Sequence, residues 1–114
     1  MASELPKISN DALYQLIRTE RFDEFNRRKA SGEKCDLKGH NFRGLDLRKL
    51  DLAGLDLSNS YFRQADLRGL NLVTCRLEGA SIHDANISGV LFPKELSADE
   101  ILLSHARGTR MRYR

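Results

Sequence analysis

The 114-residue sequence contains no apolar run that approaches the roughly 20 residues of a membrane span, and its start lacks the basic and then apolar pattern of a signal peptide. It also lacks a strong charge of either sign, because the net charge of +3 is spread evenly along the chain. With 40% apolar and 31% charged residues, the composition is ordinary for a folded protein and argues against disorder. We therefore expect one cytoplasmic domain that does not enter a membrane.

Catalytic and metal-binding patterns are scarce as well. No Ser/His/Asp set, paired acids, His-x-x-x-His or Cys-x-x-Cys occurs at a usable spacing, and His83 and His105 belong to unrelated positions. Cys35 and His40 lie five residues apart and could hold a metal only with ligands from elsewhere. We expect no enzyme activity, no metal and no cofactor.

What the sequence does contain is a period of five. Leu, Ile or Phe stands at every fifth position without interruption: Leu37, Phe42, Leu47, Leu52, Leu57, Phe62, Leu67, Leu72, Leu77, Ile82, Ile87 and Phe92. This period fits neither a helix, which repeats every 3.6 residues, nor a flat strand, which repeats every 2.0. The chain must therefore turn a corner at each repeat, and the glycines that often follow two residues later permit such a turn.

The twelve pentads of residues 35–94 resemble the pentapeptide-repeat family, whose pattern is Ala-(Asp/Asn)-Leu-any-any. The resemblance implies a right-handed quadrilateral β-helix with four pentads in each coil, hence about three coils. We predict a mainly β solenoid with α-helical caps at both ends. Its parts are an N-terminal helical cap (1–34), the β-helix (35–94), and a C-terminal capping helix with a basic tail (95–114).

Both caps carry helix signals, and such caps are needed because a stack of coils has apolar, unpaired ends. In the first cap, Asn10 or Ser9 can act as N-cap, and a break is expected near 19–21 before a helix end at Gly32. In the second cap, Ser97 and Glu100 form a capping box, and Gly108 ends the helix.

The two cysteines occupy the same pentad position, forty residues apart. If a coil takes twenty residues, Cys35 and Cys75 lie two coils apart, about 10 Å at the usual spacing between strands. A disulfide requires Cα atoms within about 7 Å. We predict that both thiols are reduced, buried and inert.

Pentads that are four repeats apart lie on the same face of the coil stack. We number the faces one to four by their first pentads, which begin at residues 35, 40, 45 and 50. On face two, Phe42, Phe62 and Ile82 are expected to stack inside the coil. Outward arginines form two columns, Arg43 with Arg63 on face two and Arg48 with Arg68 on face three. These columns could bind phosphates, or they could neutralise nearby aspartates such as Asp46 and Asp66.

Face four, by comparison, has no arginine in its outward column. Its outward residues include Ala53, Val73, Leu91 and Pro93, and an exposed apolar strip on a solenoid usually contacts something. Either the N-terminal helix folds over this strip, or the strip is a homodimer or partner contact. The resemblance also implies a homodimer contact at the last coil or terminal helix, through Leu91, Ile101 and Leu102.

The leading functional hypothesis is a non-enzymatic module that presents a rigid face to an unidentified protein partner, with Arg43, Arg48, Tyr61, Arg63 and Arg68 as candidate contacts. Nucleic-acid or anion binding through the arginine columns and the tail is the alternative. Modulation of a type II topoisomerase, which some family members achieve by imitating DNA, ranks below both. Such mimics are acidic, whereas this chain is basic and has only three coils.

Overall fold

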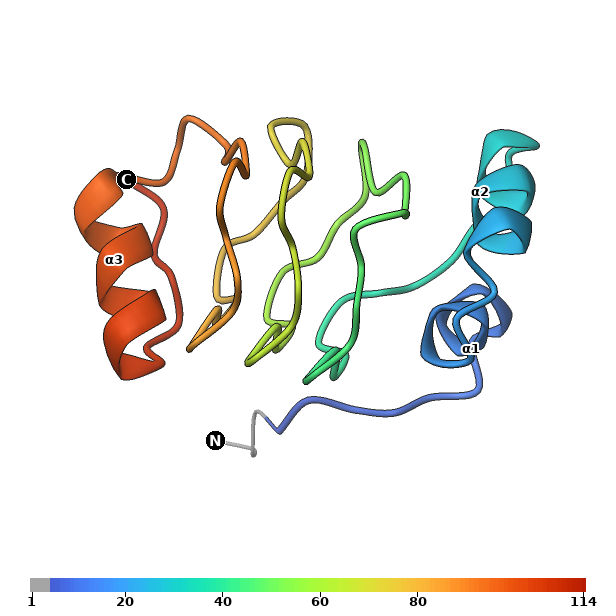
Figure 1. The fold of residues 1–114 in the computed structure, drawn as a ribbon, viewed down its shortest axis with the longest axis horizontal. Coiled ribbons are helices and arrows are strands. Elements are labelled where there is room, and N and C mark those ends of the chain that lie inside the picture. The colour runs from blue at the N-terminus through green and yellow to red at the C-terminus, as the bar shows by residue number, and fades with distance from the viewer. Residues whose placement is uncertain (1–4) are drawn as a thin grey trace.

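The computed structural model describes residues 5–114 as a stack of coils that is closed by helices at its two ends (Figure 1). Residues 1–4, the beginning of the expected N-terminal cap, lie outside the described residues. Helices α1 (Ala12–Arg18) and α2 (Phe22–Ala30) lie at one end, and α3 (Ala98–Arg107) lies at the other. The coil stack, residues 35–94, separates them.

Neighbouring coils pair through isolated parallel bridges rather than through continuous strands. Within the stack, every bridge joins residues twenty apart: Asn41–Tyr61, Asp46–Asp66, Asp56–Arg76, Tyr61–Ser81, Asp66–Asn86 and Asn71–Leu91. Backbone hydrogen bonds keep the same register, as between the Phe42 N–H and the Tyr61 carbonyl (2.8 Å). Twenty residues equal four pentads, and we propose on this register that the stack is the right-handed quadrilateral β-helix expected from the sequence.

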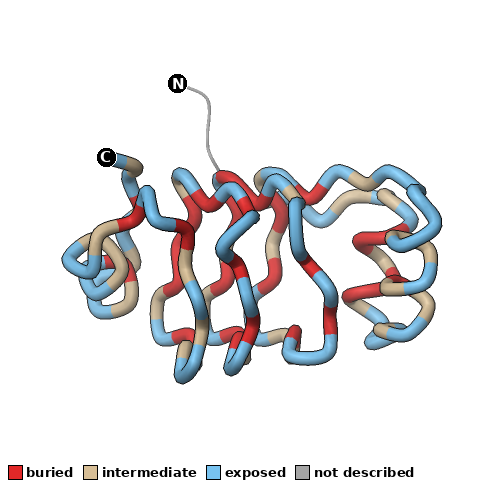
Figure 2. Tube along the Cα trace, turned by 90° about the horizontal axis from the view of Figure 1, so that it is seen from above, coloured by how far each residue is buried: buried red, intermediate tan, exposed pale blue. Residues whose placement is uncertain are grey.

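The core is a set of side-chain columns that run through the coils. The rings of Phe42 and Phe62 stack in parallel, with centroids 4.9 Å apart and planes 3° apart, and Ile82 is buried in the next coil. Tyr14 of α1 closes this column by packing edge-on against Phe42. Buried positions recur at corresponding places along successive coils (Figure 2). The inward residues of the first two coils are thus removed from water, which is the main source of stability.

The corners use the left-handed backbone region. Gly79, at the fifth position of its pentad, has a φ of 82°, and a Cβ there would collide with the side chain of Asn59 in the coil below. Asp84 occupies an equivalent corner with a φ of 54°. Asp tolerates this region better than most residues, whereas at Gly79 a larger residue would also have to displace the Asn59 side chain.

Asp11, rather than Asn10 or Ser9, is the N-cap of α1, so that part of the sequence prediction was wrong. Its Oδ1 atom accepts the Tyr14 N–H (2.9 Å), and its Oδ2 atom accepts the Asp36 N–H (3.0 Å) at the start of the first coil. A side chain three residues before the N–H that it caps is the usual geometry. The second bond, to the coil, makes Asp11 the better cap here.

Two further N-terminal groups close the first coil in ways that no sequence pattern indicated. Lys7 forms a parallel bridge with His40, so residues before α1 add a short rung beside face two. The Asn26 amide of α2 donates to the Lys49 carbonyl (2.9 Å) and accepts the Asp51 N–H (2.8 Å) beside face four. A side-chain amide therefore takes the place of a backbone rung.

At the other end, only half of the expected capping box is present. The Ser97 hydroxyl accepts the Glu100 N–H (3.2 Å), and Gly108 ends α3 in the left-handed conformation, as predicted. The Glu100 carboxylate, however, binds the backbone and guanidinium of Arg112 instead of the Ser97 backbone. The Met111 carbonyl accepts the Gly79 N–H (2.7 Å), so the basic tail is docked on the last coil.

We predict that the aromatic column dominates stability. Phe62→Ala should lower the free energy of unfolding by about 3–5 kcal/mol, because it leaves a cavity between Phe42 and Ile82. Ile82→Val, one coil away in the same column, should cost only about 0.5–1.5 kcal/mol. Urea denaturation followed by circular dichroism measures both. Equal losses for the two variants would contradict the column as the centre of the core.

Candidate interaction surfaces

The arginine column of face three is neutralised within the chain. Arg48 binds Asp46 through two parallel hydrogen bonds, from Nε (3.0 Å) and from Nη2 (2.8 Å), and its Nε also lies 3.3 Å from Asp66. Arg68 binds Asp66 in the same two-bonded geometry (3.0 and 2.8 Å). The four side chains form a ladder of alternating charge, which is the second of the two alternatives drawn from the sequence.

This ladder shifts the ionisation of its carboxylates. Hydrogen bonds from Arg48 lower the pKa of Asp46 to about 2, and those from Arg68 lower the pKa of Asp66 below its usual range. Both aspartates therefore stay charged at any physiological pH. Because each guanidinium already holds a carboxylate in its planar fork, a phosphate would have to compete with that carboxylate.

The arginines of face two differ from one another. Arg43 is exposed, and its Nε donates to the Gln64 side chain (3.1 Å). Arg63 lies with its guanidinium 4.4 Å from the centre of the Tyr61 ring and donates to the Gly108 carbonyl (3.2 Å). Arg63 thus anchors the C-terminal segment, a role that the pentad pattern could not indicate.

Tyr61 is a contact between the second coil and the C-terminal tail. The guanidinium groups of Arg63 and Arg110 both lie over its half-buried ring, that of Arg110 at 5.1 Å from the ring centre. Arg110 also donates to the Gly79 carbonyl (3.1 Å). The five predicted partner contacts therefore separate into three groups. Tyr61 and Arg63 meet beside the C-terminal tail, and Arg48 and Arg68 belong to the ladder on face three. Arg43 projects outward.

The apolar strip on face four is exposed except at one position. Ala53, Val73 and Leu91 face solvent, with Val73 at 48% and Leu91 at 55% exposure, whereas Pro93 is buried and the prediction for it was wrong. Pro93 is buried where the chain leaves the last coil and its carbonyl begins the turn to Leu96. Helices α1 and α2 lie beyond the end of the stack and do not cover the strip (Figure 1).

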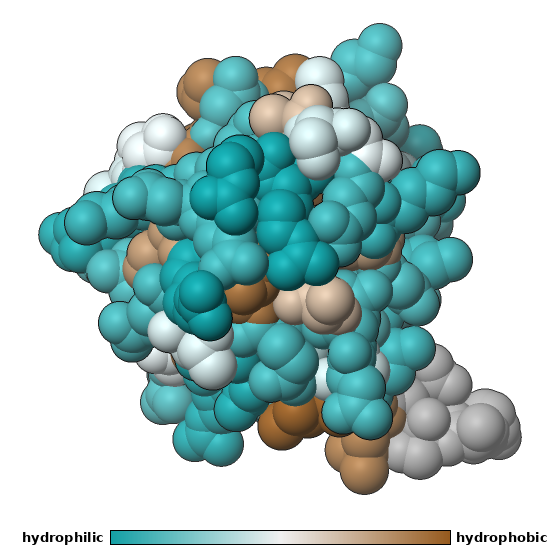
Figure 3. Space-filling model, turned by 90° about the vertical axis from the view of Figure 1, so that its right-hand side faces the viewer, coloured by the Kyte–Doolittle hydropathy of each residue, from teal (hydrophilic) through white to brown (hydrophobic). Residues whose placement is uncertain are grey.

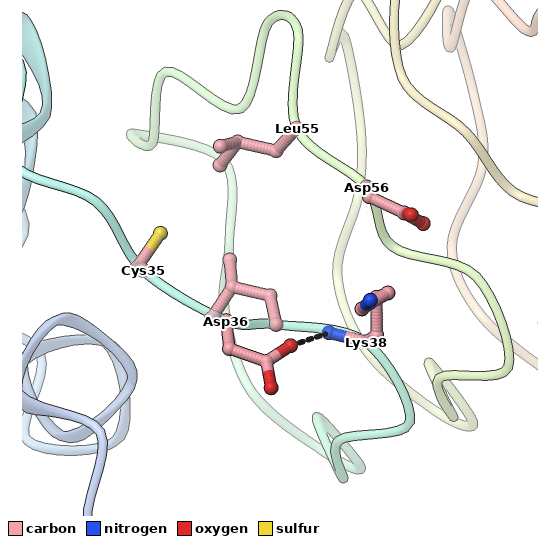
Figure 4. Close-up of a pocket in the computed structure, with 6 residues that line it drawn as sticks. Cys35, Asp36, Lys38, Leu55 and Asp56 are labelled. Carbon is pink, nitrogen blue, oxygen red and sulfur yellow. Dashed lines mark hydrogen bonds between the residues drawn. The ribbon is translucent and has the colours of Figure 1, made fainter.

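An open hollow of about 290 Å³ lies at the first coil, lined by Cys35, Asp36, Leu37, Lys38, Leu55 and Asp56. The Cys35 sulfur points toward Leu55, and the Asp36 carboxylate, which accepts the Lys38 N–H (3.1 Å), points the other way (Figure 4). Partial burial, followed by the charge of Asp11, raises the pKa of Cys35 to about 11. The thiol is therefore protonated at neutral pH and is a poor nucleophile.

Both cysteines are free, as predicted, but only Cys75 is buried; its thiol donates to the Leu52 carbonyl (3.0 Å). The prediction that Cys35 is buried was wrong, because it sits in the first coil, where it stays partly exposed. Across residues 5–114, no three His, Cys, Asp or Glu side chains gather closely enough to hold a metal ion. No helix in that range has the length and apolar character needed to cross a bilayer.

The two ends of the molecule differ in polarity. The end formed by α1 and α2 is largely hydrophilic (Figure 3). On α3, by contrast, Leu102 and Leu103 are 63% and 41% exposed, while the side chain that the helix buries is the polar Ser104. The sequence pattern counts Leu103 among the apolar residues of this helix but does not indicate its exposure, which depends on Ser104 facing the coil.

We predict that the ladder adds pH-dependent stability. The folded-state pKa values of Asp46 and Asp66 lie below those of the unfolded chain, so their stabilisation is complete above about pH 4 and is lost as the pH falls toward about 2. Asp66→Asn should therefore unfold at lower urea than the wild type at pH 7, and the difference should shrink between pH 4 and 2. Glu95→Gln is the control, since the exposed Glu95 carboxylate lies outside the helices and forms no ion pair with a described residue. A difference that does not change with pH would argue against the ladder.

Comparison with known proteins supports the repeat pattern directly. The family model described as "Pentapeptide repeats (8 copies)" matches residues 33–64 and 56–92, which together make up just over half of the chain. Comparisons with curated proteins and with solved structures gave no match. Because the match spans the stacked coils and their twenty-residue register, the chain belongs to the pentapeptide-repeat family.

Proposed function

We propose that this protein is a non-enzymatic interaction module whose stacked coils hold a surface strip in a fixed shape for a protein partner. The strip of Ala53, Val73 and Leu91 is the observation that carries the proposal. Three consecutive coils place one apolar residue each on face four, and no described segment covers them. Exposed apolar residues gathered on one rigid face are typical of a protein contact.

Nucleic-acid binding is less well supported. Phosphate recognition needs cations that are free to approach the backbone, but Arg48 and Arg68 are held by carboxylates and Arg63 is held by the C-terminal segment. Imitation of DNA would need an unpaired acidic surface, yet Asp46 and Asp66 are paired. Face three is therefore close to neutral, which favours neither of these functions.

The test is affinity capture with three matched baits. Val73→Asp combined with Leu91→Asp should lose the partner that wild type retains, because two buried charges would oppose the contact. Lys38→Asp, an exposed change on face one that alters the net charge by the same amount, should retain it. Mass spectrometry identifies the retained proteins. The proposal fails if wild type retains nothing, or if the two aspartates on face four change nothing.

The variant Arg43→Glu distinguishes binding through the arginine columns from binding through the strip on face four. The Arg43 side chain bonds only to Gln64 among the described residues, so the variant should fold normally and should keep the partner captured through face four. Loss of the partner would move the contact to face two. A salt-dependent shift of duplex DNA by wild type that disappears in Arg43→Glu would support nucleic-acid binding instead.

We also propose a homodimer contact through the outer side of α3. Asp99 and Arg107 lie four residues before and four residues after Leu103, and both are exposed. If two α3 helices pack antiparallel about Leu103, each Asp99 meets the Arg107 of the other copy, which is the self-complementary pattern of a twofold interface. The hydrophilic opposite end (Figure 3) disfavours open head-to-tail chains.

Sedimentation equilibrium tests this contact against the chain mass of 13.0 kDa. Wild type should sediment with twice that mass, and Leu102→Asp should sediment as a monomer. Asp99→Arg should weaken the dimer by placing like charges together, and adding Arg107→Asp to it should restore the association. A monomeric wild type at high micromolar concentration refutes the dimer but leaves the strip on face four unaffected.

A further inference from the structure

The last coil is closed on two of its four faces by the C-terminal segment. On faces one and two, its N–H groups that point away from the stack have acceptors: Leu77 to the Tyr113 hydroxyl, Gly79 to Met111, Ile82 to the Ser104 hydroxyl and Asp84 to His105. These bonds range from 2.7 to 3.1 Å. The tail and the end of α3 therefore act as a further rung on this side.

Face three of the last coil has no such rung. In the preceding coils, the Leu67 N–H donates to the Asn86 carbonyl (2.9 Å) and the Gly69 N–H donates to the Ser88 carbonyl (2.9 Å). The corresponding donors one coil later are the N–H groups of Ile87 and Gly89, and no described residue accepts from either. Two backbone donors, two residues apart, thus lie along an open sheet edge.

The side chains at this edge are only partly covered. Ile87 is half-buried, although its counterpart one coil earlier, Leu67, is 1% exposed. At the opposite end of face three, beside the first coil, Leu47 is fully buried. Of the two ends of face three, as far as residues 5–114 show, only the edge at the last coil therefore combines unpaired backbone donors with apolar surface.

We propose that an extended segment of a protein partner adds to this edge as the next rung of face three. Its carbonyl groups would accept the Ile87 and Gly89 N–H groups, and an apolar side chain between them would cover Ile87. The neighbouring outward residues, Asn86 and Ser88, are uncharged, so the edge imposes no charge on the segment. Backbone pairing of this kind supplies affinity, and the side-chain pocket supplies selectivity.

A second copy of the chain fits the edge poorly. Its own first coil, which would have to supply the matching edge, lies beside the helices α1 and α2, and α3 stands at the receiving end (Figure 1). Bringing the two edges together would therefore require the terminal helices to move. A short extended peptide carries no terminal helices of its own, which is why it is the proposed occupant.

This inference deepens the proposed function, because it names one mode by which a partner can be held. The probe is a synthetic peptide with the sequence of residues 64–70, Gln-Ala-Asp-Leu-Arg-Gly-Leu, which already forms a rung of face three. In the free protein, the Ile87 and Gly89 amides should exchange rapidly with deuterium in NMR spectra. When nine in ten molecules hold peptide, their exchange should slow by about tenfold, since only the free fraction exchanges.

Two controls make the result specific. A peptide with Asp in place of its first Leu should not slow the exchange, because it would place a charge over Ile87. An ester that replaces the Ile87 amide removes one donor without changing the side chain, and it should weaken binding of the first peptide at least about fivefold. An ester at Ser88, whose N–H forms no bond with a described residue and lies between the two donors, should bind the peptide normally.

The inference is overturned if Ile87 and Gly89 already exchange slowly, if the peptide protects neither amide, or if the Ile87 ester binds as well as wild type. These outcomes are independent of the capture experiment. Peptide protection together with an empty capture by wild type would reject the proposed function and keep the edge. Successful capture without peptide protection would reject the edge and keep the function.

Discussion

The structure depends on one constraint, which is that residues twenty apart must lie directly above one another. Parallel bridges such as Asn41–Tyr61 and Tyr61–Ser81 fix this register in the backbone, and the stacked rings of Phe42 and Phe62 fix it in the core. A shift by one residue would turn inward side chains to the surface. The corner residues, including Gly79 and Asp84, allow the chain to meet the constraint at every turn.

The same register determines what the surface can do. Because coils repeat at short spacing, outward charges of one kind are brought close together, and the chain offsets this on face three by alternating aspartate with arginine. Most of the arginines that the sequence predicts as ligand contacts are thus bonded to neighbouring residues of the chain. Three surfaces have no such charge pairing. The strip on face four and the outer side of α3 are apolar, and the edge of the last coil has unpaired backbone N–H groups.

The pentad pattern predicted the stack well because each repeat states its own geometry locally. The positions of Leu37 to Phe92, the corner glycines and the break between α1 and α2 all follow from spacing and conformational preference. The pattern could not indicate contacts between segments far apart in sequence. Arg63 meets Gly108 across 45 residues, and nothing in either pentad or tail signals that meeting.

The errors have the same origin. Asp11 replaces Asn10 and Ser9 as N-cap because Asp36 offers it a second bond, and Cys35 is only half-buried because no complete coil precedes it. Pro93 was assigned to the strip on face four by its pentad position, yet the chain is already leaving the stack there. Terminal repeats are atypical in such architectures, and predictions that assume a regular repeat are least accurate at the ends.

The docking of the C-terminal tail has a consequence for how the molecule unfolds. A stack of similar coils could in principle fray from its last coil inward, since each coil contacts only its neighbours. Here Arg110 reaches past the third coil to stack on Tyr61 of the second, and Tyr113 bonds to Leu77 from 36 residues away. Removing the last coil therefore also breaks the Arg110–Tyr61 contact in the middle of the stack, and we expect the array to unfold as a cooperative unit rather than coil by coil.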